Sequence, residues 1–178
     1  MSDLCESLEA EHRMIELVLD ALERETRKVV SGAGVDREFF TKAIIFVREF
    51  ADGLHHQKEE SILFPHMAEA GVPREGGPIG VMLYEHDEGR HCVRQMSQAL
   101  DQAAAGDAQA RRALSEAALD YVALLRAHIM KEDQVLFPMA DRVFDERQKG
   151  TVRAGFSEAE AADPRRDEAH RTWAQGLA

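Results

Sequence analysis

The chain has 178 residues, a formal net charge of −11 and 6% aromatic residues; this length suits one domain with a full hydrophobic core. The acidic balance argues against nucleic acid or an anionic membrane as a partner, because both require basic surfaces. No uninterrupted apolar run is long enough to span a bilayer. The segment from Met1 to Glu6 lacks the features of a signal peptide, and two cysteines, Cys5 and Cys92, are too few for a disulfide framework. A cytoplasmic location is therefore expected.

Apolar residues recur at helical spacing through the first half of the chain. The apolar stripe of the first predicted helix includes His12, and the Ser-Gly-Ala-Gly run at 31–34 ends that helix. Asp36 is a suitable N-cap for a second helix. This second helix carries His55 on its buried side and should end or kink near Pro65.

The second half repeats this organisation. A loop rich in glycine and proline at residues 70–78 joins the two halves. A third helix is predicted from about Pro78 to Ala105, with His86 facing inward, and Gly106-Asp107 forms a helix stop followed by a cap. The fourth helix carries His128 on its apolar side.

These four helices predict an all-α fold, an antiparallel four-helix bundle built from two duplicated helical hairpins. We assign the bundle to residues 1–141. Residues 142–178 are predicted to form a short helical appendix, with helix starts at Ser157 and Asp163. The appendix is expected to pack on the bundle through three aromatic residues, Phe144, Phe156 and Trp173.

One sequence pattern occurs twice in the chain. Residues 55–65 and residues 128–138 both fit H-x-x-K-E-[ED]-x-[IV]-L-F-P. A Glu-His pair precedes each copy at nearly the same distance, Glu11-His12 before the first and Glu85-His86 before the second. A long repeat with matching internal spacing indicates duplicated helical units. Each unit supplies one lone histidine and one His-x3-Glu pair.

Residues at positions i and i+4 lie on the same face of a helix, so a histidine and a glutamate at this spacing can bind one metal ion. A carboxylate in such a site can also bridge two ions. Imidazole and carboxylate ligands without a thiolate favour iron, manganese or zinc. The alternative is hydrogen-bonded core histidines and surface ion pairs, but burying so many polar groups without compensation would be costly. The predicted metal ligands are His12, His55, Glu59, His86, His128 and Glu132.

The first copy of the motif contains a second pair with the same spacing, His56 and Glu60. Aligning the Leu-Phe-Pro triplets matches His55 and Glu59 with the ligands predicted in the second copy. We therefore place His56 beside the site, and the sequence leaves open whether His56 or Glu60 replaces His55 or Glu59. Three further histidines are not expected to bind metal: His66, His91 and His170.

These motifs resemble the hemerythrin-like family, also called the HHE cation-binding domain, over about residues 4–140. The resemblance implies a four-helix bundle around a non-haem centre of two iron ions with an oxo or hydroxo bridge. Carried onto this chain, it implies that His12 and His55 serve one iron, that His86 and His128 serve the other, and that Glu59 and Glu132 bridge them.

The chain departs from the oxygen-carrying members of this family at one position. Those proteins have a further histidine four residues after the one that matches His86, and this chain has Arg90 there. A guanidinium group stays protonated and cannot bind a metal ion. Two imidazoles per iron and an open position near His86 are therefore expected. Arg90 should turn to solvent or pair with an acidic residue, with candidates Glu59, Glu132, Glu85 and Glu16.

Open coordination positions make reversible oxygen carriage doubtful and favour other roles. The main hypothesis is a di-iron binding protein that binds or senses O2, nitric oxide or iron, with a small diatomic ligand or peroxide as its small-molecule partner. A sensor of this kind would act through a separate protein partner. The alternative hypothesis is a di-iron enzyme that acts on hydrogen peroxide or nitric oxide, and the sequence does not decide between them. A third is a structural bundle that binds zinc adventitiously.

Overall fold

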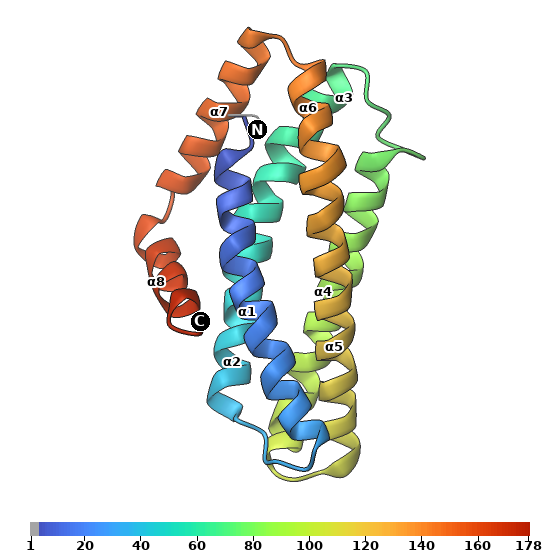
Figure 1. Cartoon of the computed structure of the whole chain (residues 1–178), viewed down its shortest axis with the longest axis vertical. Coiled ribbons are helices and arrows are strands. Elements are labelled where there is room, and N and C mark those ends of the chain that lie inside the picture. The colour runs from blue at the N-terminus through green and yellow to red at the C-terminus, as the bar shows by residue number, and fades with distance from the viewer. Residues whose placement is uncertain (1–3) are drawn as a thin grey trace.

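The computed structural model describes residues 4–178. The first three residues of the predicted bundle, which also begin the segment without signal-peptide features, therefore lie outside the described part. The described chain is helical and without strands, which confirms the all-α prediction (Figure 1). None of its helices combines the length and apolar character needed to cross a membrane. The longest helices run side by side along the long axis: α1 (Glu6–Val30), α4 (Pro78–Ala104) and α5 (Ala108–Lys131).

The second predicted helix is a series of α- and π-helical segments. The sequence predicts an end or kink near Pro65, but the chain stays helical to Glu69. Pro65 lies in the first turn of the last segment, where its missing N–H costs little. The segments are α2 (Arg37–Phe46), η1 (Val47–His56), η2 (Glu59–Leu63) and α3 (Phe64–Glu69).

The fourth predicted helix changes its hydrogen bonding at the equivalent place. Helix α5 is followed by a π-helical segment, η3 (Glu132–Leu136), and then by α6 (Phe137–Val143). Both copies of the motif therefore contain π-helix, which is rare and is frequently found at functional sites. The hydrophobic periodicity of the sequence does not distinguish these wider turns from α-helix.

Two predicted N-caps are confirmed. The Asp36 side chain accepts a hydrogen bond from the backbone N–H of Phe39, and Asp107 accepts one from Ala110. Gly106, just before this second cap, has a φ of 101°, a conformation that favours glycine. The α1–α2 and α4–α5 loops, which lie at the same end of the bundle (Figure 1), are therefore where the sequence predicts them.

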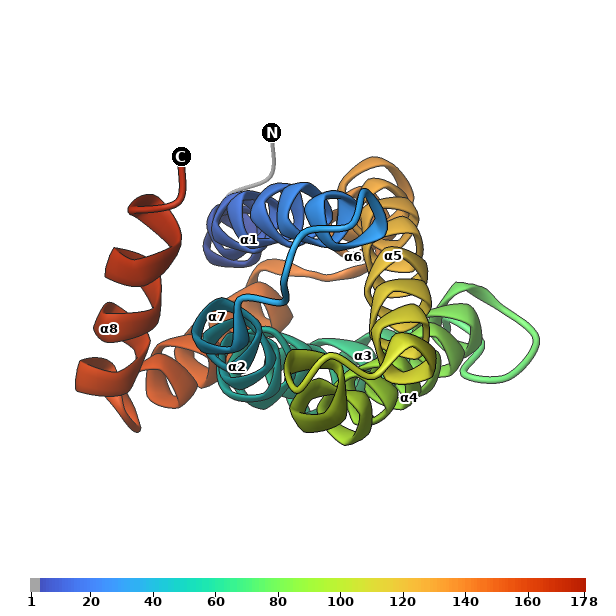
Figure 2. The ribbon, with the colours of Figure 1, turned by 90° about the horizontal axis from the view of Figure 1, so that it is seen from below.

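The C-terminal residues form α7 (Glu146–Ala161) and α8 (Pro164–Gln175), which lie outside the main bundle (Figure 2). The predicted helix start at Ser157 is wrong, because α7 begins earlier with a capping box between Asp145 and Gln148. The predicted cap at Asp163 is confirmed. Of the three aromatic residues expected to pack on the bundle, Phe144 and Phe156 are buried and Trp173 is partly buried.

The apolar core is divided into two clusters along the helices. The larger contains residues such as Leu19, Phe46 and Leu125, and the smaller contains residues such as Leu8, Phe64 and Phe137. Between them, each long helical arm carries buried polar residues. From N- to C-terminus, this polar layer contains Glu11, His12, His55, His56, Lys58, Glu59, His86, His128 and Glu132.

Candidate metal centre

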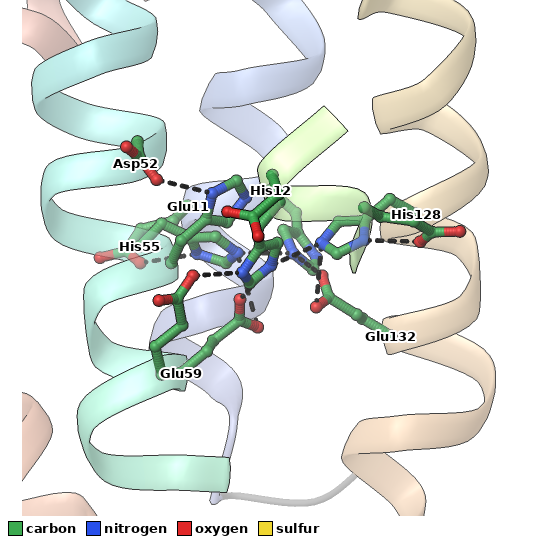
Figure 3. Close-up of polar contacts among 12 residues, drawn as sticks. Glu11, His12, Asp52, His55, Glu59, His128 and Glu132 are labelled. Atoms are coloured by element: carbon green, nitrogen blue, oxygen red, sulfur yellow. Dashed lines mark hydrogen bonds and ion pairs between the residues drawn. The ribbon is translucent and has the colours of Figure 1, made fainter. Parts of the chain in front are cut away.

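The six predicted ligands are all buried in this polar layer. Figure 3 shows that the side chains of His12, His55, Glu59, His128 and Glu132 converge. Within each of two groups, the potential ligand atoms lie within 4.8 Å of one another. The first, called the His12 group, contains His12, His55 and Glu132. The second, called the His86 group, contains His56, Glu59, His86 and His128.

Two imidazoles in each group meet through their Nε2 atoms. The Nε2 atoms of His12 and His55 are 3.0 Å apart, and those of His86 and His128 are 3.2 Å apart. Two nitrogen ligands at ~2.0–2.1 Å from one metal ion, with an angle of roughly 90–110° between them, are themselves about 3 Å apart. Each imidazole pair therefore has the spacing of two ligands to one ion.

The two buried carboxylates span both groups. Glu132 places one oxygen 3.2 Å from the Nε2 atom of His12 and the other 3.1 Å from the Nε2 atom of His128. Glu59 likewise places one oxygen 3.8 Å from the Nε2 atom of His55 and the other 3.4 Å from the Nε2 atom of His86. None of the four carboxylate oxygens has a well-aligned hydrogen bond within the described residues. Buried oxygens without donors are costly, and metal ions would satisfy them.

The outer nitrogen of each imidazole contacts a carboxylate from another part of the chain. An Nδ1–H that donates to a carboxylate fixes the ring and leaves the Nε2 lone pair for a metal ion, as is usual in protein metal sites. The Nδ1–carboxylate contacts are His12–Asp133 at 2.7 Å, His55–Glu11 at 3.0 Å, His86–Glu60 at 2.7 Å and His128–Glu85 at 2.9 Å.

The lysine of the repeated motif holds one of these outer carboxylates in each half. Lys58 Nζ lies 2.7 Å from Glu11, and Lys131 contacts Glu85. This role was not predicted from the sequence. The repeat contained the signal, because both the lysine and the glutamate before the lone histidine recur in both halves.

The phenylalanine of the motif covers one histidine in each half. Phe137 stacks on His12 with ring centroids 5.4 Å apart, and Phe64 stacks on His86 at 6.0 Å. Each apolar ring shields one face of an imidazole from water. The doubled Leu-Phe-Pro triplet therefore belongs to the site as well as to the core.

His56 lies in the centre, although the sequence analysis places it beside the site. Its ring stacks on His86 with centroids 3.8 Å apart, its Nδ1 atom is 3.3 Å from Asp52, and its buried Nε2 atom has no partner in the described part of the chain. In α-helix, adjacent side chains diverge by about 100°, but the wider π-helical turn brings His55 and His56 toward the same side. His56 therefore adds to His55 instead of replacing it.

Arg90 is paired, but its predicted partners are wrong. Its guanidinium group lies 2.7 Å from Asp52 and 2.7 Å from Glu60, the two carboxylates that contact His56 and His86. Glu59 is not its partner because that carboxylate faces the inner imidazoles. Among the other candidates, Glu132 is turned toward the inner imidazoles. Glu85 is held by His128 and Lys131, and Glu16 is paired with Arg13.

The charges around the centre favour a cation. Burial alone would lower the pKa of His12, but Asp133 and Glu132 raise it to about 9. Burial likewise opposes a charge on His128, yet Glu132 raises that pKa to about 10. Burial and the nearby Glu132 raise the pKa of Glu59 to about 7. The carboxylates of this layer raise the pKa values of His12 and His128, which shows that the layer carries excess negative charge. A metal ion would neutralise that charge.

The three histidines not expected to bind metal join neither group. His66 contacts the backbone oxygen of Ile62, His170 pairs with Glu49, and His91 is exposed. Metal binding by the six predicted residues stays a prediction, and the geometry places all six where that prediction needs them.

The helical arms and the buried histidine–carboxylate layer define a helical protein of the metal-binding class. The chain belongs to the hemerythrin HHE cation-binding domain family, whose family model matches residues 3–140. This confirms the family suggested by the repeated motif.

Curated relatives differ in how much of the chain they match. An uncharacterized protein of Mycobacterium tuberculosis is 26% identical over 164 residues, which are 85% of this chain and 64% of that protein. The iron-sulfur cluster repair protein YtfE of Musicola paradisiaca is 37% identical over 91 residues, 49% of this chain and 40% of that protein. YtfE of Pectobacterium atrosepticum is 32% identical over 90 residues, 49% of this chain and 41% of that protein. The chain thus spans less than two thirds of these relatives. No solved structure matches significantly.

Proposed function

We propose that this chain is a non-haem di-iron binding protein, an antiparallel four-helix bundle that binds or senses O2, nitric oxide or iron. The observation that carries the proposal is the pair of carboxylates, each with one oxygen beside an imidazole of either group. His12 and His55 would hold one ion, His56, His86 and His128 would hold the other, and Glu59 and Glu132 would reach both.

Bound iron would supply a redox-active Lewis acid for small ligands such as O2, nitric oxide or peroxide. The protein residues orient the imidazoles through their Nδ1 atoms and keep water from them with Phe64 and Phe137. The His12 group offers two imidazoles and the His86 group three. We therefore assign the more open position to the ion at His12 and His55, and not to the one near His86.

The biological setting is part of the same proposal. Cys5 and Cys92 are both free thiols, which fits a reducing compartment such as the cytoplasm. The YtfE relatives, named iron-sulfur cluster repair proteins, support a role in which the chain handles iron. A sensor would pass its state to a separate protein partner.

Metal analysis tests the centre directly. Protein from iron-supplemented cells is expected to hold two irons per chain, and His128→Ala should lose most of that iron because it removes a ligand of the His86 group. His91→Ala is the matched control, since His91 is exposed and joins neither group. One zinc or no metal in the wild-type chain, or normal iron in His128→Ala, would count against the proposal.

A second substitution distinguishes a four-histidine centre from a five-histidine centre. His56→Ala is expected to weaken binding of one of the two irons, by about 10–100-fold if His56 only orients the site and by more if it is a ligand. Competition with a chelator of known affinity measures the change. If both irons bind as tightly as in the wild-type chain, His56 has no part in the centre.

An enzyme that acts on hydrogen peroxide or nitric oxide is the second candidate. It is favoured by a cavity whose lining includes His56 and His86, which would give a substrate access to the centre. Peroxide added to the iron-loaded protein separates the two functions. Repeated evolution of O2 would establish catalysis, whereas a single change in the optical spectrum without turnover would establish binding alone.

A further inference from the structure

A cavity of about 240 Å³ lies beside the His86 group, where η1, α4 and α5 meet. His56 and His86 are among its lining residues, so it reaches the edge of the metal centre. Its volume is just below the roughly 300–1,000 Å³ of pockets for drug-sized ligands. A ligand that fits it must therefore be small.

Three arginines line this cavity in a chain whose overall charge is strongly negative. Arg90 is paired with Asp52 and Glu60. Arg48 and Arg94 are exposed, and neither forms an ion pair with another described residue. Each guanidinium group is a planar set of donors suited to a carboxylate, and the cavity has two of them without an ion-pair partner among the described residues.

The opposing charge on the cavity wall is Asp52. Its carboxylate lies 2.7 Å from the Arg90 guanidinium group, which neutralises it. The remaining wall charge is positive and attracts a small anion.

The rest of the lining is apolar, with one buried hydroxyl. Val47, Val93 and Gly89 line the cavity together with Tyr121. The Tyr121 side chain is buried, and its hydroxyl has no hydrogen-bond partner among the described residues. Buried polar atoms are nearly always satisfied, so this hydroxyl is available to a polar atom of a molecule bound in the cavity.

We propose that this cavity binds a small organic monocarboxylate beside the His56–His86 edge of the metal centre. The carboxylate lies at Arg48 and Arg94, and the apolar body of the ligand lies against Val47, Val93 and the Tyr121 ring. The inference rests on the proposed function for its place beside bound metal, but the binding itself requires only the cavity and its arginines.

Calorimetric titration of the metal-loaded protein with benzoate tests the proposal. We expect one benzoate per chain, and at least about tenfold weaker binding of benzyl alcohol, which has a similar shape and no charge. Arg94→Gln should weaken benzoate binding about tenfold or more. Arg147→Gln is the matched control, because this exposed arginine in α7 does not line the cavity.

A second variant tests the space instead of the charge. A Cβ atom at Gly89 would lie 3.5 Å from the Tyr121 ring, an ordinary contact, so Gly89→Ala should fold and narrow the cavity. It is expected to weaken benzoate binding while all arginines remain.

Three outcomes would overturn the proposal: equal binding of benzoate and benzyl alcohol, no effect of Arg94→Gln, or no binding by the wild-type chain. Metal analysis of the same samples keeps the two ideas separate. A chain that takes up no iron but still binds benzoate through Arg94 would contradict the proposed function and leave the cavity proposal intact. Binding that needs metal and ignores Arg94 would place the carboxylate on the ion and disprove the arginine site.

Discussion

Replacing Lys58 with methionine is expected to lower the free energy of unfolding by about 3–5 kcal/mol, the usual cost of breaking a buried ion pair by removing one partner. Lys58 is fully buried, and its ammonium group lies 2.7 Å from Glu11 and 2.8 Å from Glu160 of α7. Methionine has a similar volume but no charge. Glu11 would remain buried, and among the described residues its remaining arginine or lysine partner would be Arg171 of α8 at 3.4 Å.

The repeat supplies a matched control in the same molecule. Lys131 occupies the equivalent position and contacts Glu85, but its side chain is 36% exposed. Lys131→Met should therefore cost no more than about 1 kcal/mol. Urea unfolding of the metal-free proteins gives both values. Equal losses at the two positions would show that burial by α7 and α8 does not set the strength of the interaction.

A double variant identifies the charge as the cause. In Lys58→Met combined with Glu11→Gln, no buried carboxylate is left without its ammonium partner, so much of the lost stability should return. If the double variant is as unstable as the sum of the single variants, the loss at Lys58 arises from packing against Phe156 and not from the ion pair.

The repeated motif made the histidines and the inner carboxylates predictable. Their spacing placed one imidazole on each helical arm, and the structure brings all of them into one buried layer. The same repeat also contained the outer contacts. Glu60 and Asp133 hold the Nδ1 atoms of histidines in the opposite half, and a comparison of every repeated position, beyond the potential ligands, would have indicated them.

Other features left no readable signal in the sequence. His56 faces the centre because η1 is π-helical, and hydrophobic periodicity does not reveal a π-helical turn. Asp52 and Glu60 could not be identified as the partners of Arg90, because their positions depend on how η1 and η2 face α4. The contact between Glu160 and Lys58 joins residues 102 positions apart, and only the packing of α7 on the bundle determines it.

Metal removal and the Glu59→Gln substitution are expected to have large effects on stability, and the effect of the substitution should have opposite signs with and without metal. Complete removal of metal is expected to lower the melting temperature of the wild-type chain, because the buried Glu59 and Glu132 carboxylates then lose the metal ions and, among the described residues, keep only protonated imidazoles as cationic partners. Glu59→Gln removes one of these charges. We expect this variant to be more stable than the wild-type chain without metal and less stable with metal, since an amide is a poor substitute for a bridging carboxylate.

The pH dependence of the metal-free proteins gives the sign of the effect. Burial raises the pKa of Glu59 from 4.5 to about 7, so the folded state loses stability as the pH rises through this interval. Each unit of elevation corresponds to ~1.4 kcal/mol. The advantage of Glu59→Gln should therefore be largest above pH 7, shrink as the pH falls and disappear near 4.5.

Glu60→Gln is the matched control for this experiment. Glu60 is the neighbouring glutamate, but its pKa is lowered because it accepts a hydrogen bond from His86 and another from Arg90. Its charge stabilises the fold, so Glu60→Gln should reduce stability with or without metal. Melting temperatures of the three proteins, with metal content verified in each state, decide the matter. If Glu59→Gln lowers stability in the metal-free state as well, the buried carboxylate pair is not the source of strain, and protons or other side chains already neutralise it.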